Sequence, residues 1–238
     1  MLRAYLLVYP FLALYVALGA AIFVPLTWLI RDIRPIYWVS RTGIRLALWL
    51  SGVRVKQVDQ SYATAHPTSV FVCNHVSNID PPALFLTLPR IAVILKKELS
   101  QIPLLGYVMK LGGFIYVDRQ ARNSRHEALS TGVATLRNGI SLLIFPEGTR
   151  SRSGKMLPFR PGPFTMAIEA GAPIVPITVH GARELMPKGT LGLRPGAVTL
   201  VFHEPIETAD MQAEDRAELM QRTRAVMERI LAQGQARP

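Results

Sequence analysis

The chain opens with a long apolar stretch. The 27 residues from 4 to 30 carry no charged side chain, and about 20 apolar residues in a helix are enough to cross a bilayer core. Pro10 and Pro25 lie inside this stretch, where we expect them to kink or shorten the helix. A cleaved signal peptide or a buried core helix would share some of these features. The length and composition favour a helix in contact with a membrane.

The next stretch, residues 34–55, has a different pattern. Arg41 and Arg45 are four positions apart and therefore lie on one helical face, whereas Trp38 and Trp49 offer interfacial apolar surface. This pattern predicts a helix that lies in or on the membrane interface. We therefore interpret residues 1–52 as a membrane-associated helical arm. The pattern is compatible both with an arm that spans the bilayer and with one that dips into it and returns.

From about residue 53, short apolar runs alternate with helical patterns. Their continuous rather than alternating apolarity is typical of strands buried on both faces. We expect residues 53–238 to form a single α/β domain, a mixed sheet flanked by helices, with no internal repeat or second-domain linker. The predicted strands lie within 68–74, 91–97, 112–119, 140–150, 172–181 and 197–206, and the predicted helices within 81–88, 124–139, 163–171 and 211–233.

The charge balance narrows the class of partner. A formal net charge of +11 indicates an anionic partner, namely nucleic acid, a membrane surface or a phosphorylated substrate. Aromatic residues are few and are not interleaved with basic ones, which argues against nucleic acid. Residues 1–56 hold seven basic side chains against Asp32. Four of the arginines follow the apolar stretch closely, so the positive-inside rule predicts a domain that faces the cytoplasm.

The cysteine and histidine pattern excludes some chemistry. Cys73 is the single cysteine, so the chain has neither an internal disulfide nor a cysteine-based metal site. The five histidines are scattered without a metal-binding spacing. We expect no bound metal.

Polar clusters follow three of the predicted strands: "NHVSNID" (residues 74–80), "VDR" (117–119) and "FPEGTR" (145–150). In parallel α/β sheets, binding sites gather beyond the carboxyl ends of the strands, so the three clusters predict one pocket. Histidine is the side chain that ordinarily changes charge near neutral pH, so His75 is a candidate general base, and Asp80 is placed to orient it. Asp80 also precedes Pro81-Pro82 and looks like a helix N-cap. The two roles are compatible.

Other residues of these clusters are candidates for binding. Arg150 can hold a phosphate bidentately, and Gly148 allows the backbone to approach a ligand closely. Glu147 either orients an arginine or binds substrate hydroxyls, although a solvated basic loop would have the same composition. Ser77 is a candidate nucleophile, for which we favour a loop or capping role, and Cys73 is a weaker one. Arg119 and Arg160 are further candidates for binding phosphate. Lys96 and Lys97 are candidates for contacts with anionic lipid or with a phosphate of the donor, and Asn74 is a candidate supporting residue.

The ordered motifs resemble those of a known family. "NHVSNID" fits N-H-x-S-x-x-D, the first motif of the glycerolipid acyltransferases that use lysophosphatidic acid, and "GGFIYVDR", "FPEGTR" and "PIVPITV" resemble the second, third and fourth. The resemblance covers residues 70–205. It implies that His75 is the base, that Asp80 orients it, and that the acceptor is bound by Glu147, Gly148, Thr149, Arg150 and Arg119. One departure is Phe159-Arg-Pro-Gly-Pro163, in which Arg160 keeps the charge usual there but two prolines stiffen the loop.

The resemblance also implies an activity. It is transfer of a fatty acyl group from acyl-CoA or acyl-ACP to the free hydroxyl of 1-acyl-sn-glycerol-3-phosphate, giving phosphatidic acid, with no cofactor besides the thioester co-substrate. The expected location is a bacterial-type inner membrane. The expected partners are the lipid bilayer and, if the donor is acyl-ACP, acyl carrier protein. Three alternatives stay open: a different acceptor (glycerol-3-phosphate or a lysolipid without phosphate), a hydrolase that uses Ser77 or Cys73, and a non-catalytic adaptor that binds acidic lipids.

Overall fold

A seven-stranded sheet forms the centre of the protein. The computed structural model describes residues 4–118 and 120–235, and in this part of the chain the strand order is β1-β7-β6-β2-β5-β3-β4. All neighbouring strands are parallel except β6 and β7, so the predicted single mixed sheet is confirmed. The strands are β1 (Val53–Val58), β2 (Val70–Cys73), β3 (Ile91–Lys96), β4 (Ile115–Val117), β5 (Ser141–Ile144), β6 (Ile174–His180) and β7 (Gly196–Phe202).

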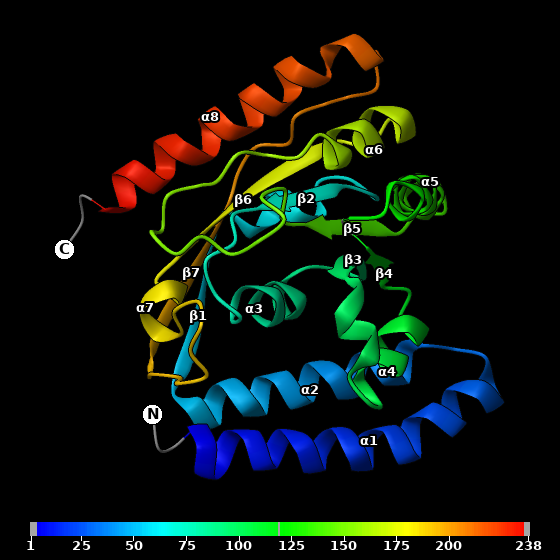
Figure 1. Cartoon of the computed structure of the whole chain (residues 1–238), viewed down its shortest axis with the longest axis vertical. Helices are drawn as coiled ribbons and strands as arrows, with labels where there is room; N and C mark the ends of the chain where they lie inside the picture. Colours follow the sequence, from blue (N-terminus) through cyan, green and yellow to red (C-terminus); the bar gives the residue numbers. More distant parts are fainter. Residues whose placement is uncertain (1–3, 119, 236–238) are drawn as a thin grey trace.

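Helices cover both faces of the sheet, and a helical hairpin lies beyond one of them (Figure 1). α3 lies between the sheet and the hairpin, and α5, α6 and α8 lie on the other side. The helices are α1 (Tyr9–Ile30), which follows a π-helical turn (Ala4–Val8), α2 (Arg34–Ser51), α3 (Asp80–Thr87), α4 (Leu105–Leu111), α5 (Arg122–Arg137), α6 (Gly162–Ala170), α7 (Ala182–Leu185) and α8 (Arg216–Gln235), with 3-10 turns at Gln60–Thr64, Lys97–Gln101 and Ala213–Asp215.

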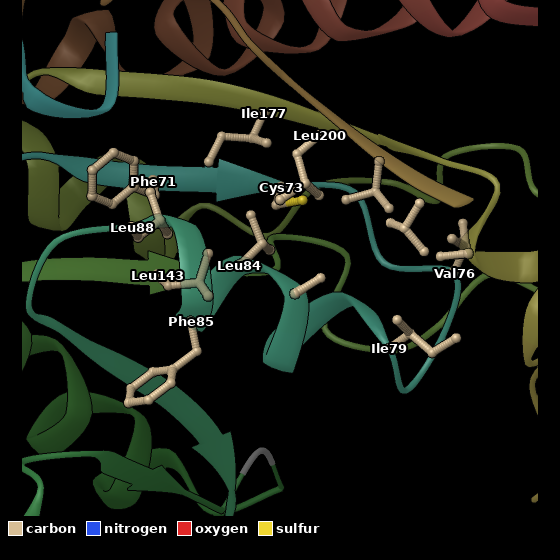
Figure 2. Close-up of a cluster of buried hydrophobic side chains, with 14 of the residues drawn as sticks. Phe71, Cys73, Val76, Ile79, Leu84, Phe85, Leu88, Leu143, Ile177 and Leu200 are labelled. Carbon is tan, nitrogen blue, oxygen red and sulfur yellow. The ribbon is translucent and has the colours of Figure 1, made fainter. Parts of the chain in front are cut away.

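The strands are buried on both faces, as their continuous apolar runs predict. Because successive strand residues point to opposite faces, Phe71 and Cys73 of β2 join the core beneath α3, whereas Val70 and Val72 join the core beneath α5, α6 and α8. Figure 2 shows the first core, where α3 packs its apolar side chains against β2 and β5. Packing on both faces holds the carboxyl ends of β2 and β5 in fixed positions.

The interfacial helix ends earlier than the sequence pattern suggests. The interfacial pattern runs to residue 55, but α2 ends at Ser51 and β1 begins at Val53, next to the end of the arm that we placed at residue 52. Gly52 adopts φ +73° and donates its N–H to the carbonyls of Leu48 and Trp49, which is a common way to terminate a helix. β1 was not predicted because it lacks a continuous apolar run, although Val53-Arg-Val-Lys56 has the alternation of a half-exposed strand, as suits its place at the sheet edge.

The helical hairpin is built from α1 and α2, which lie side by side (Figure 1). Tyr15 donates its hydroxyl to the carbonyl of Val39 at 2.9 Å, and its ring lies over Gly43, where a Cβ would come within 2.4 Å of a ring carbon. Pro10 occupies the first turn of α1, and Pro25 lies inside this helix without ending it. Residues 4–30 are the only stretch of the described chain with a helix long and apolar enough to cross a membrane.

Hydrogen bonds join α2 to the α/β domain. The guanidinium of Arg41 donates to the carbonyls of Leu88 and Pro89, and Tyr37 donates its hydroxyl to the carbonyl of Ile91. These contacts join α2 to the segment between α3 and β3. The hairpin is therefore held against the domain by α2, and also by Tyr9 of α1, which donates its hydroxyl to the carbonyl of Leu191. α1 lies on the outer side (Figure 1).

Candidate active site

The first and fourth motifs meet at the carboxyl ends of β2 and β6. The side-chain amide of Asn74 pairs with the backbone of Val179: its Oδ1 accepts the N–H at 2.8 Å and its Nδ2 donates to the carbonyl at 3.3 Å. Asn74 is buried, so this pairing fixes the start of the loop that follows β2. The loop carries His75 as its next residue.

His75 and Asp80 form a close pair. Nδ1 of His75 lies 2.8 Å from Oδ2 of Asp80, and the same oxygen accepts the backbone N–H groups of Val76 and Ser77 at 2.8 Å each. A carboxylate oxygen that accepts two N–H groups is an acceptor toward the imidazole as well, so Nδ1 carries the proton. Nε2 then keeps its lone pair. Asp80 is fully buried, whereas the His75 side chain is 17% exposed.

The sequence pattern suggests that Asp80 is the N-cap of α3, and the structure corrects this expectation. Asp80 is the first helical residue, and Ile79 occupies the cap without a side-chain bond. An N-cap side chain accepts the N–H of the second or third helical residue. With Asp80 as the cap these would be Pro82, which has no N–H, and Ala83, whose N–H is donated to the carbonyl of Ile79. The carboxylate instead turns back to the loop and to His75.

An aromatic ring supports the imidazole from one side. Phe145, the first residue after β5, stacks on His75 with ring centroids 4.2 Å apart and 25° between the planes. Phe145 opens the third motif, although the sequence alone gave it no separate role. Stacking together with the Asp80 contact restricts the orientation of the imidazole.

Glu147 connects the backbones of three loop segments. It is buried, its Oε1 accepts the N–H of His75 and its Oε2 accepts the N–H of Leu157, both at 2.8 Å. Burial raises the pKa of this carboxyl, and these two hydrogen bonds partly oppose the rise. Ser151 donates its N–H to the carbonyl of His75 at 2.7 Å. The described contacts of Glu147 thus position the His75 backbone, whereas we expected bonds to an arginine or to substrate.

The remaining third-motif residues face several cations. Gly148 adopts φ +70°, and a Cβ there would lie 2.5 Å from Nε of Arg160, so only glycine lets Arg160 lie across this turn. Lys188 donates its ammonium to Oγ1 of Thr149 at 3.0 Å and to the carbonyl of Arg150 at 2.7 Å. Nη1 of Arg150 is buried and has no hydrogen-bond partner within the described chain.

The structure does not bring Lys96 or Lys97 into the described site around His75. Lys96 and Lys97 are exposed at the end of β3, where Lys96 lies 2.5 Å from Glu98 and Lys97 lies 3.6 Å from Asp118. β5 separates β3 from β2, and each lysine has a carboxylate partner. Arg119 lies outside the described residues.

Two cavities with basic side chains flank the third-motif loop, the larger of them otherwise mostly apolar, and sequence reasoning missed most of their cations. A cavity of about 660 Å³ beside α5 and α6 is lined by Gly148, Arg160, Arg125 and Arg216, with Glu169 as the acidic side chain. Another of about 450 Å³ is lined by Arg152, Arg183, Lys188 and Arg194, with Glu184. Arg125, Arg160 and Arg216 are far apart in sequence, as is Arg152 from Arg183, so the fold brings them together.

The two candidate nucleophiles are inaccessible. Ser77 is fully buried, donates to the carbonyl of Met186 and accepts the N–H of Ile79. Cys73 is fully buried in the core, and burial raises the pKa of its thiol well above the ordinary value, which suppresses the reactive thiolate. Neither side chain is therefore placed to act as a nucleophile, and both contribute to the packing of the fold. In residues 4–118 and 120–235, no cluster of three His, Cys, Asp or Glu side chains is arranged to hold a metal ion.

Comparisons with known proteins identify the family of the chain. The Acyltransferase family profile matches residues 53–180. The chain is 31% identical over 186 residues to a 1-acyl-sn-glycerol-3-phosphate acyltransferase of Salmonella typhimurium, covering 77% of this chain and 75% of the relative. It is 31% identical over 172 residues to one of Cocos nucifera, covering 71% and 55%, so the chain spans about half the length of that relative.

A solved structure is similar over almost the whole chain. The crystal structure of the 1-acyl-sn-glycerophosphate acyltransferase PlsC from Thermotoga maritima superposes with a TM-score of 0.78 at 27% identity. The match covers 95% of this chain and 96% of that chain, and so includes the helical hairpin as well as the sheet domain.

Proposed function

This chain belongs to the acyltransferase family, and on that premise we propose that it transfers a fatty acyl group from an acyl thioester to the free hydroxyl of 1-acyl-sn-glycerol-3-phosphate, giving phosphatidic acid. The observation that carries the proposal is the pair of His75 and Asp80 at the carboxyl end of β2. Several relatives are named for this reaction.

His75 acts as the general base. Its unprotonated Nε2 takes the proton of the acceptor hydroxyl as the oxygen bonds to the thioester carbonyl carbon. The tetrahedral intermediate then expels the thiolate, the C–S bond breaks, and the imidazolium returns its proton to the sulfur. Asp80 remains ionised throughout and stabilises the imidazolium, as in a serine-protease triad whose nucleophile is supplied here by the substrate.

Cations beside the third motif hold the acceptor phosphate. A guanidinium binds phosphate through two parallel hydrogen bonds, and Nη1 of Arg150 lacks a partner in the described chain. Arg160, which lies across Gly148, adds a second positive charge. Fixing the phosphate determines which hydroxyl reaches His75. The donor is acyl-CoA or acyl-ACP, and the phosphate carried by either suits the neighbouring cavity with Arg152, Arg183 and Lys188.

The hairpin lies in the cytoplasmic leaflet of the membrane rather than across the bilayer. α2 is fastened to the domain and α1 lies along it, so α1 follows the surface of the domain. Leu14, Leu18 and Ile22, four residues apart, expose one apolar stripe along α1. This arrangement lets a membrane-resident acceptor approach the domain without leaving the bilayer.

An acceptor panel tests the proposal. The full chain in membranes receives labelled acyl-CoA with lysophosphatidate, glycerol-3-phosphate or monoacylglycerol, and lysophosphatidate should be acylated fastest. Arg150→Ala should weaken this preference mainly through KM for lysophosphatidate. Equal use of monoacylglycerol would contradict the phosphate site. Thioester hydrolysis that Cys73→Ala abolishes would favour a hydrolase, although the burial of Cys73 argues against it.

A further inference from the structure

We propose that a pocket of arginines on α2 binds the phosphate of an anionic membrane phospholipid, at a site separate from that of His75. The pocket has a volume of about 340 Å³ and is lined by arginines together with the aromatic side chains of Tyr37 and Trp38. We call it the arginine pocket; its basic residues are Arg34, Arg41, Arg45 and Arg90.

The helical repeat gathers most of these residues on one side of α2. Positions 34, 38, 41 and 45 are three or four residues apart and therefore adjoin each other along the helix. Arg90 comes from the segment between α3 and β3, to which α2 is fastened. The pocket consequently depends on the docking of the hairpin against the domain.

One guanidinium of the pocket is already held in position. Arg41 donates to the carbonyls of Leu88 and Pro89, and its guanidinium carbon lies 5.9 Å from the ring centroid of Tyr37 and 5.7 Å from that of Phe85. Its Nε is buried and has no hydrogen-bond partner in the described residues. A fixed cation with a free donor loses little freedom when it binds an anion.

The charges of the pocket are not balanced by protein carboxylates. Asp32 is the neighbouring acid: it bonds Arg34 at 2.5 Å, and the hydrogen bonds from Arg34, with the charges of Arg34 and Arg90, lower its pKa. Arg45 and Arg90 are exposed, and neither forms an ion pair in the described chain. An excess of positive charge remains, and phosphate is the anion that guanidinium groups bind best.

The surroundings of the pocket favour a lipid as the source of the phosphate. Two tryptophans of α2 are exposed: Trp38, which lines the pocket, is 64% exposed, and Trp49, further along the helix, is 72% exposed. Tryptophan concentrates at the level of lipid headgroups. α1 adds exposed apolar side chains that suit the acyl region. Arginines next to Trp38 would then lie at the level of the lipid phosphates.

The strand register separates the arginine pocket from the catalytic site. β3 starts at Ile91, directly after Arg90, and Ile91 pairs in parallel with Ser141, the first residue of β5. Arg90 therefore lies at the amino-terminal edge of the sheet. His75 follows the carboxyl end of β2, which is parallel to β5. The two sites lie at opposite edges, so the bound lipid is not the acyl acceptor at His75; it fixes the hairpin on the membrane surface.

Vesicle flotation of the full chain tests this inference. The probes are vesicles of phosphatidylcholine alone and of phosphatidylcholine mixed with phosphatidylglycerol. Each arginine near an anionic surface contributes about fivefold to binding, so Arg45→Gln with Arg90→Gln should weaken binding to the mixed vesicles about 25-fold. Binding to phosphatidylcholine alone should not change, because the apolar surface is intact.

A matched double variant separates a site from diffuse attraction. Arg54→Gln with Lys56→Gln removes the same charge from exposed positions of β1, directly after α2 but outside the pocket. It should weaken binding to the mixed vesicles far less. Equal losses in the two double variants, or no loss from Arg45→Gln with Arg90→Gln, would overturn the proposal.

A second readout excludes an acceptor role for these arginines. Neither Arg45 nor Arg90 belongs to the site around His75, so acyl transfer in neutral detergent micelles should stay within about twofold of the wild type for the pocket variant. Loss of turnover in micelles, with the fold intact by circular dichroism, would assign the arginines to the acceptor site and contradict the proposal.

Discussion

His75 is held by Asp80 through the same carboxylate oxygen that binds the backbone of the loop between them. Oδ2 of Asp80 lies 2.8 Å from Nδ1 of His75 and 2.8 Å from the N–H nitrogens of Val76 and Ser77. Three donors on one buried oxygen fix both the loop and the imidazole. The five-residue spacing is therefore needed for loop geometry as well as for the orientation of His75.

Asp80→Asn should separate orientation from charge. The amide retains the size of the carboxyl group but cannot stabilise an imidazolium, and its NH₂ group would face donors if it replaced Oδ2. We expect kcat to fall at least about 100-fold with little change in KM for lysophosphatidate. Steady-state kinetics with a thermal melt of each protein checks this. A folded variant with near wild-type kcat would show that Asp80 has only a structural role.

Glu147→Gln should reveal a positioning role. The carboxylate accepts the N–H groups of both His75 and Leu157, whereas a glutamine has one acceptor oxygen and would place its NH₂ group against the other donor. We expect a loss of about 1–3 kcal/mol in the free energy of unfolding and a fall in kcat. Denaturant unfolding and kinetics measure these effects. If KM for lysophosphatidate rises while stability is unchanged, Glu147 binds the acceptor instead.

Gly148→Ala can be compared with a matched glycine. Gly148 has φ +70° and Arg160 lies where a Cβ would be, whereas Gly139 has φ +76° and nothing within 4 Å. Both alanine variants should lose about 1–2 kcal/mol of stability through the left-handed backbone. Only Gly148→Ala should also reduce acyl transfer, because it displaces Arg160. Equal activity of the two folded variants would dissociate Arg160 from acceptor binding.

Acid should destabilise the fold through a histidine outside the site. Burial, reinforced by the nearby charges of Arg229 and His180, lowers the pKa of His203 from 6.5 to about 4. The unfolded chain therefore binds more protons than the folded one between these values. Stability is complete above pH 6.5 and falls as the pH drops toward 4, by about 3 kcal/mol in all.

Denaturant melts between pH 7 and pH 4 check this dependence. In His203→Gln the free energy of unfolding should fall less between pH 7 and pH 4, by about 3 kcal/mol. The control His126→Gln, at an exposed position, should leave this fall unchanged. An unaltered slope in His203→Gln would mean that other groups cause the acid sensitivity.

The sequence was informative where one short segment carries both structure and chemistry. The apolar run that ends at Cys73 predicted β2 and placed His75 just beyond a strand end, and the strand alternation puts Phe71 and Cys73 on the α3 face. The mixed sheet and the apolar helix were also predictable from apolar runs. Each of these signals is local in the chain.

Features that depend on distant segments were not predictable in the same way. β1 is too short for its alternation of valine and polar residues to be decisive, and its backbone pairing with β7 establishes it as a strand. Lys188 reaches Thr149 across 39 positions, and no motif connects them. The backbone contacts of Glu147 depend on the return of the chain at Leu157. Tertiary structure determines these contacts, and one sequence does not display them.

Acyl transfer by His75→Ala is the most direct test of the central claim that this histidine is the base. Membranes carrying the wild type or the variant receive a labelled thioester and lysophosphatidate, and Cys73→Ala serves as a control for a residue that the mechanism does not use. We predict a fall of about 100- to 10,000-fold in rate for His75→Ala, with the protein folded and still bound to the membrane. Full activity in that variant would contradict the account.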